Sequence, residues 1–346
     1  MLEKPNLHDE TILACVRESY GLPVAGVEFL PVGNDSYAWV YRARTEDGAS
    51  YFVKVKKGPV SKPSLIIPRH LKDSGIEQVV APLRTTVHDL WTDVDGYTLI
   101  LYPFVEGSVG MEVGLSDHQW MEFGAALRRV HSSRLSAELL EQVRRETFAP
   151  KWGGVVKELQ RQINTTAYHD PIAQALASFW KEHSETIGRM VERAEKLGRA
   201  LQHDSSVLVL CHADIHTANI LLDQDQKLFM VDWDEALLAP IERDLMFVVG
   251  GAVGGAAVES QAEAWFFKGY GATPLDPAAL AYYRYEWVVQ EIGDFGERVL
   301  LMDGVGDETR ADAVQGFRDL FQPGNVVEAA SSSEAHLPPH LRVTRV

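Results

Sequence analysis

A polar segment between two short apolar runs constrains this chain more than any other part of its sequence. Asp214 follows His212 by two residues, Asn219 follows Asp214 by five, and Asp232 ends an apolar run thirteen residues later. In phosphoryl-transfer sites, one carboxylate accepts the proton of the attacking hydroxyl, while an asparagine and a second aspartate hold magnesium. The spacing therefore predicts Asp214 as catalytic base and Asn219 and Asp232 as ligands of Mg²⁺.

The residues around this segment predict a structure that suits such a site. Residues 207–210 indicate a short buried strand, and residues 219–222 and 227–231 indicate two strands joined by the polar turn 223–226. A hairpin of this kind would bring Asn219 and Asp232 close together. Asp214 would lie on the loop before it.

Composition restricts the classes of partner. The 346 residues are 46% hydrophobic, which is enough for a sizeable core, and the net charge is −16. This acidity disfavours nucleic acid and suits a cationic small molecule. We find no leader peptide and no apolar run of 18 residues, and Cys15 and Cys211 form no disulfide framework, so we expect a cytoplasmic protein without membrane contact. We expect a monomer or weak dimer.

The order of predicted elements indicates an α+β fold with two lobes, like that of protein kinases. Strands are predicted near residues 27–32, 37–43, 51–56, 77–84 and 97–102, with a helix near 64–74, and helices near 117–131, 152–163, 172–201, 260–270 and 277–298. We therefore expect a nucleotide-binding lobe at 1–104 and a catalytic and substrate-binding lobe at 105–329. Residues 330–346 are predicted to be a disordered tail.

Several motifs carry a resemblance to a known family. The His212 to Asn219 segment, followed by Val231-Asp232-Trp233-Asp234, resembles the aminoglycoside phosphotransferase and choline kinase family. The runs Tyr51-Phe52-Val53-Lys54, Leu101-Tyr102-Pro103-Phe104, Glu242-Arg243-Asp244-Leu245-Met246-Phe247 and Asn325-Val326-Val327-Glu328 are similar to the spectinomycin phosphotransferases within it. The resemblance implies ATP as cosubstrate, Mg²⁺ as cofactor and an aminocyclitol hydroxyl as acceptor.

On the nucleotide side, Lys54 is predicted to reach the α- and β-phosphates from an alternating strand. Ser36 would donate to the phosphates from a turn, and Tyr102, Phe104 and Val105 would offer backbone groups to the purine. One departure from the kinase pattern stands out. No glutamate occurs between Lys54 and residue 75, so either Glu77 or another acid pairs with this lysine, or the lysine relies on the charges of nucleotide and magnesium.

On the substrate side, acids are predicted to meet the amines of a cationic acceptor. The candidates are Asp234, Glu235, Glu286 and Asp294, and His216 either faces the substrate or bonds to nearby backbone. For Asp234 and Glu235 a structural or solvated role stays open. His212 is predicted to organise the loop, and Asp244 is predicted to cap a helix N-terminus that braces the site.

Three alternatives remain open at this level. A kinase for choline, homoserine or a thiosugar would share the core motif. A metallohydrolase would use His212 and His216 as zinc ligands, four residues apart on a helix. A pseudokinase would bind nucleotide without magnesium-dependent turnover.

Overall fold

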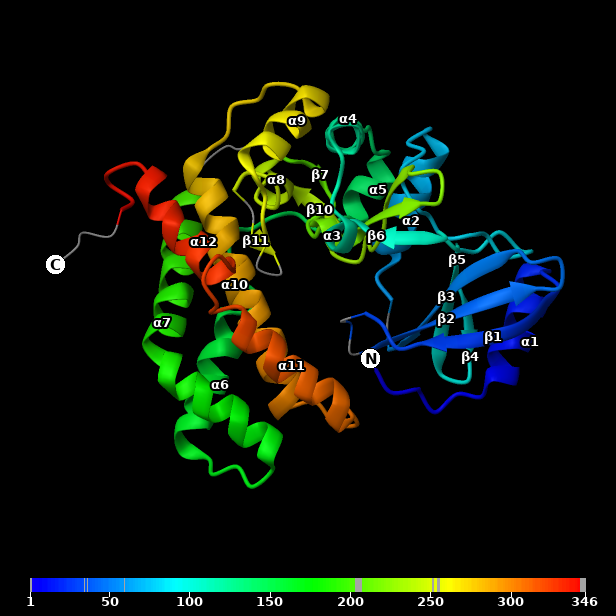
Figure 1. Cartoon of the computed structure of the whole chain (residues 1–346), viewed down its shortest axis with the longest axis horizontal. Helices are drawn as coiled ribbons and strands as arrows, with labels where there is room; N and C mark the ends of the chain where they lie inside the picture. Colours follow the sequence, from blue (N-terminus) through cyan, green and yellow to red (C-terminus); the bar gives the residue numbers. More distant parts are fainter. Residues whose placement is uncertain are drawn as a thin grey trace. The chain divides into compact units, whose positions relative to one another are not determined.

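Figure 1 shows the computed structural model of the chain, which describes residues 2–33, 35, 37–58, 60–202, 207–250, 252–253 and 256–342. Packing divides the chain into two compact units. The first contains Met1–Val143 and Thr217–Ala236, and the second contains Arg144–His216 and Leu237–Val346. The predicted lobe boundary at residue 104 differs from the boundary between these units, since the helices of residues 110–142 belong to the first unit.

An antiparallel sheet of five strands, in the order β1-β2-β3-β5-β4, forms the core of the first unit (Figure 1). The strands are β1 (Val24–Leu30), β2 (Ala38–Thr45), β3 (Ser50–Lys57), β4 (Thr92–Val94) and β5 (Tyr97–Pro103), and α1 (Asp9–Tyr20) packs on β1 and β4. In β3, Val53 and Val55 are fully buried, so the alternation of a strand places Lys54 on the opposite face. Ile100 of β5 and Val40 of β2 flank Lys54 in register.

The predicted hairpin after the polar segment is confirmed. β8 (Ile220–Asp223) and β9 (Leu228–Met230) are antiparallel, and β6 (Gly107–Val109) completes their sheet. The amide of Val231 donates a hydrogen bond of 3.0 Å to the carbonyl of Asn219. Asn219 and Asp232 therefore flank the open end of this hairpin.

Further helices belong to the first unit. They are α2 (Lys62–Asp73), α3 (Gly110–Val113), α4 (Asp117–His131) and α5 (Ala137–Gln142). Ser116 and Gln119 form a reciprocal capping box, which fixes the start of α4. The prediction of a strand near residues 77–84 is wrong. Its amides donate to different partners, Val80 to Met230 and Leu83 to Leu101, so no continuous ladder forms.

Helix α10 (Pro277–Leu300) is central to the second unit and packs against α6 (Gly153–Thr165), α7 (Pro171–Leu201), α11 (Asp307–Asp319) and α12 (Val326–Ser332) (Figure 1). Small residues permit this close contact. A Cβ atom at Gly296 would lie 2.7 Å from Leu159 Cδ1 and 2.9 Å from Trp180 Cζ3, so only glycine fits without displacement.

Short elements complete the second unit. β7 (Val209–Cys211) pairs with β10 (Leu237–Ala239), and β11 (Ala252–Val253) pairs with β12 (Ala256–Ala257). The remaining helices are α8 (Glu242–Leu245) and α9 (Ser260–Tyr270). Strand β7 leads directly into the loop that carries His212 and Asp214.

For residues 330–342 the prediction of a disordered tail needs correction, and residues 343–346 of that tail lie outside the described residues. The end of α12 and the 3₁₀ helix Ser333–His336 are ordered, and Leu337 is buried. Glu334 accepts hydrogen bonds from Arg193 of α7 at 2.7 Å and from the Tyr285 hydroxyl of α10 at 2.9 Å. These bonds order a polar segment that its composition alone predicts to be disordered. Across the described ranges, no helix is both long enough and apolar enough to span a membrane.

Candidate active site

The first unit contains a cluster of ion pairs centred on two lysines of β3. Lys54 Nζ lies 3.3 Å from Asp232 Oδ1 and 3.0 Å from Asp234 Oδ2. Lys56 Nζ lies 2.7 Å from the same Asp234 oxygen and 2.8 Å from Asp35 Oδ2. The Lys54 side chain is only 11% exposed. Residues 178 and 180 positions apart in the chain thus meet on one face of the sheet.

The local backbone after β9 explains how both aspartates face the lysines. Asp232 has a φ of 63°, in the left-handed region that aspartate tolerates better than most residues. Trp233 is 3% exposed, and its indole donates to the Met230 carbonyl at 3.4 Å. The buried indole anchors the segment between the two aspartates.

The charges of this cluster reinforce one another. Burial disfavours the charged form of Lys54, but the carboxylates of Asp232 and Asp234 outweigh that effect and raise its pKa well above the ordinary value. Burial likewise opposes ionisation of Asp234, yet the two ammonium groups lower its pKa. Lys54 and Asp234 are therefore both charged at neutral pH.

The residues predicted to bind magnesium have suitable donors. Asn219 ends the 3₁₀ turn Thr217–Asn219, and its backbone bond to Val231 holds it beside the segment that carries Asp232. The Asp232 side chain is 47% exposed, so its carboxylate is accessible. An amide oxygen and a carboxylate are the hard donors that Mg²⁺ prefers, and the pair fits the ion.

The other predicted nucleotide residues lie around β5 and the segment after it. Tyr102 pairs in register with Phe52, with ring centroids 6.3 Å apart. The Arg42 guanidinium lies 4.4 Å from the ring centroid of Phe104. Tyr102 therefore lies on the same sheet face as Lys54. Ser36 lies outside the described residues.

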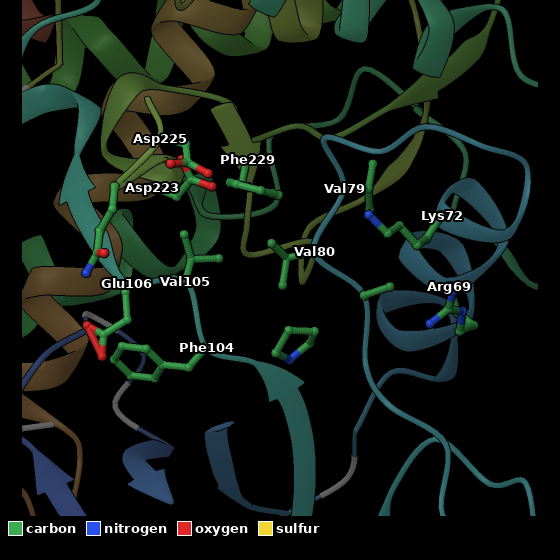
Figure 2. Close-up of a pocket in the computed structure, with 13 residues that line it drawn as sticks. Arg69, Lys72, Val79, Val80, Phe104, Val105, Glu106, Asp223, Asp225 and Phe229 are labelled. Atoms are coloured by element: carbon green, nitrogen blue, oxygen red, sulfur yellow. The ribbon is translucent and has the colours of Figure 1, made fainter. Parts of the chain in front are cut away.

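A cavity of about 400 Å³ adjoins the segment after β5 in the first unit. Figure 2 shows Phe104, Val105 and Val80 between Arg69 and Lys72 on one side and Glu106, Asp223 and Asp225 on the other. Phe104 and Val105 line this cavity, whereas Lys54, Asn219 and Asp232 do not. The predicted purine and phosphate residues are therefore not brought into one described cavity.

In the second unit, a buried carboxylate shapes the loop that carries Asp214. Asp244 accepts hydrogen bonds from the amides of His212 at 2.9 Å and Ala213 at 2.6 Å. Ala213 has a φ of 72°, an uncommon conformation for alanine that these bonds stabilise. Asp244 lies inside α8, so the prediction that it caps a helix is wrong, although it does brace the loop.

Two histidines support this loop in different ways. His212 is fully buried, and its Nδ1 accepts from the Asp214 amide at 3.3 Å. His216 Nε2 lies 3.2 Å from Asp214 Oδ1, and its ring contacts Phe247 and Trp287. The segment is not helical between them, so the helical spacing that would favour a zinc site is absent.

The acids predicted to meet substrate amines are divided between the units. Asp234 and Glu235 belong to the first unit, and Asp234 already has two lysine partners. Glu286 and Asp294 lie on α10 in the second unit, where Glu286 is 3.3 Å from Arg243 and Asp294 is 2.5 Å from Arg298. Glu286 and Asp294 thus share one helix, but each pairs with a different arginine.

Sequence reasoning missed Glu291, a partly buried acid of α10. Burial, with the nearby charges of Asp294 and Asp214, raises the pKa of Glu291 to about 8, while Arg298 opposes this effect. The available signal was a single ionisable residue within an apolar helical run, three residues before Asp294. Glu291 is therefore protonated at neutral pH in the folded chain.

Replacing Glu291 by glutamine should stabilise the protein at pH 8 and change little near pH 4.5. An unfolded chain ionises this carboxyl above its ordinary value of 4.5, whereas the folded chain keeps the proton up to about 8, so stability falls as pH rises between them. Each unit of pKa difference corresponds to about 1.4 kcal/mol, so the gain at pH 8 should be a few kcal/mol.

Urea unfolding of both proteins at several pH values would measure this difference. The two curves of unfolding free energy should diverge steadily above pH 4.5. Curves that stay parallel from pH 5 to 8 would contradict a raised pKa for Glu291.

Comparison with known proteins places these groups in a family. Residues 27–283 match the phosphotransferase enzyme family known as APH. This range includes Lys54, Asp214, Asn219 and Asp232, and it covers most of the chain.

Solved structures agree with this match. A spectinomycin phosphotransferase, APH(9)-Ia, in complex with ADP and spectinomycin is 33% identical, with 95% of this chain and 99% of that chain covered and a TM-score of 0.86. Its AMP-bound complex is 32% identical, with 94% and 99% covered and a TM-score of 0.82. An amicoumacin kinase bound to AMP-PNP, 16% identical over 92% of this chain and 95% of that chain, shares the fold at a TM-score of 0.61. The chain therefore belongs to the APH phosphotransferase family, has its kinase-like fold, and is an ATP-binding phosphotransferase that acts on a hydroxyl acceptor.

Proposed function

We propose that this protein transfers the γ-phosphoryl group of ATP to a hydroxyl of spectinomycin or a closely related aminocyclitol. The observation that carries this proposal is the 33% identity, over 95% of the chain, to an enzyme solved with ADP and spectinomycin. Modification of a hydroxyl by a phosphate adds negative charge and bulk to the antibiotic, which would inactivate it.

The first unit supplies the nucleotide side of the reaction. Lys54 contacts the α- and β-phosphates, and Tyr102, Phe104 and Val105 contact the purine. Asn219 and Asp232 would hold Mg²⁺, which neutralises charge on the phosphates. We assign Asp234 to the nucleotide side and not to the substrate side, because its carboxylate already binds Lys54 and Lys56.

The second unit supplies the base. Asp214 accepts the proton of the acceptor hydroxyl as that oxygen bonds to the γ-phosphorus and the bond to ADP breaks. His216, 3.2 Å from the Asp214 carboxylate, restricts its orientation. Asp244 and His212 hold the loop backbone in the shape that presents Asp214.

Acids of the second unit favour a cationic acceptor. Asp214, Glu291 and Asp294 are close enough for their charges to raise the pKa of Glu291 after burial. An amine bound near them would offset the negative charges of Asp214 and Asp294, and the net charge of −16 would attract it over longer distances. The acceptor amines are therefore expected to contact α10.

Incubation of the purified protein with Mg-ATP and spectinomycin, followed by mass spectrometry, tests this function. One added phosphoryl group, absent when ATP is omitted, would support the proposal. No product from spectinomycin but product from choline, homoserine or a thiosugar would instead identify a metabolite kinase. Nucleotide binding without transfer to any acceptor tested would favour a pseudokinase.

A further inference from the structure

The helix that usually supplies a partner to the strand lysine of a kinase offers none here. Helix α2 contains a single acid, Asp73, at its end. Asp73 is 52% exposed and is paired with Arg69 and, at 3.6 Å, with Arg84. In the usual arrangement, a glutamate of this helix fixes the lysine for the phosphates. Another residue must hold Lys54 in this protein.

Two carboxylates reach Lys54, and they differ in what else they do. Asp232 is 47% exposed and is the residue proposed above to bind Mg²⁺. Asp234 is 27% exposed and lies closer to Lys54, at 3.0 Å. If Asp232 serves the ion, Asp234 remains as the carboxylate that forms an ion pair with Lys54 among the described residues.

Lys56 forms a second ion pair with Asp234 and connects it to Asp35. It shares Asp234 Oδ2 with Lys54 and also pairs with Asp35 at 2.8 Å, while the Tyr37 amide donates to Asp35 at 2.8 Å. The shared carboxylate offsets the repulsion between two ammonium groups on the same strand face. A chain of ion pairs thus connects Lys54 to the turn that precedes β2.

We propose that Asp234 is the positioning residue that fixes Lys54 for the nucleotide phosphates, in place of the missing helix glutamate. Lys56 and Asp35 extend this function to the turn before β2. A lysine side chain has four flexible bonds, so a fixed partner reduces the entropy lost when the ammonium binds phosphate. The inference rests on the proposed phosphotransfer, but it concerns the nucleotide and does not depend on which acceptor is used.

Asp234→Asn, with Asp73→Asn as the matched control, tests the proposal. Binding of ATP, measured by calorimetry without acceptor, should weaken at least about tenfold in Asp234→Asn, which corresponds to about 1.4 kcal/mol. Turnover should also fall, and the KM for the acceptor should stay unchanged. Asp234→Glu should recover part of the loss, and Asp73→Asn should bind ATP like the unmodified protein. Equal ATP binding by Asp234→Asn and the unmodified protein would overturn the proposal, as would a loss confined to Asp73→Asn.

A double-mutant cycle with Lys54→Met separates positioning from a structural effect. If Asp234 acts through Lys54, adding Asp234→Asn to Lys54→Met should change ATP binding less than about twofold. Independent losses that multiply would show that Asp234 acts in another way. Thermal unfolding of each variant identifies any that fails to fold, and Asp234→Glu then replaces Asp234→Asn in the cycle. A wrong acceptor would abolish product formation even in the unmodified protein, while the ATP-binding comparison would still decide this inference.

Discussion

Asp214→Asn should lower kcat by about 10²- to 10⁴-fold, the usual contribution of a general base, and leave ATP binding nearly unchanged. The amide has the shape of the carboxylate but does not take up the hydroxyl proton. The loop should keep its conformation, because the bonds that hold it involve backbone groups. Asp244 accepts from the backbone N–H groups of His212 and Ala213, and the backbone N–H of residue 214 donates to His212. The loss should therefore fall on the chemical step.

Initial rates of phosphoryl transfer and calorimetric ATP binding would check this expectation. Asp307→Asn is a suitable control, since Asp307 is 84% exposed in the first turn of α11. It should retain full turnover. An Asp214→Asn protein with normal turnover would remove Asp214 from the reaction, and a large loss of ATP binding would instead indicate damage to the fold.

Elements with a strong hydrophobic period were predictable from the sequence. Helix α4 forms over the predicted residues 117–131 because its apolar face and its capping box agree. Residues 77–84 have the composition of a strand, yet tertiary hydrogen bonds to Met230 and Leu101 decide their structure. The order at Glu334 has the same origin, since Arg193 and Tyr285 hold it from distant helices.

The same distinction between local sequence patterns and distant contacts applies to the candidate site. The spacing of Asn219 and Asp232 predicts their proximity because both belong to one hairpin. The pairing of Lys54 with Asp234 joins residues 180 positions apart, and no local pattern encodes it. The raised pKa of Glu291 likewise depends on burial and on Asp214 and Asp294, which become neighbours only in the folded unit.

Asp232→Ala should abolish the dependence of nucleotide binding on magnesium. The substitution removes the carboxylate of the proposed pair of magnesium ligands and leaves the Asn219 amide oxygen, a neutral donor. Loss of a direct carboxylate ligand should reduce metal affinity by more than about 100-fold, beyond the usual effect of outer-shell substitutions. Calorimetric titration of ADP with and without Mg²⁺ would measure the effect. An unchanged magnesium dependence would exclude Asp232 as a ligand.

Comparison with Asp234→Asn makes this prediction specific, because the two aspartates are only two residues apart and both contact Lys54. Asp234→Asn should weaken nucleotide binding in the presence and absence of Mg²⁺ by a similar factor, since it acts on Lys54. Asp232→Ala should weaken binding mainly when Mg²⁺ is present, and Lys54 should keep its bond to Asp234. If both variants lost the magnesium dependence equally, the two aspartates would have to act as one metal-binding group, and the separate positioning function of Asp234 would fail.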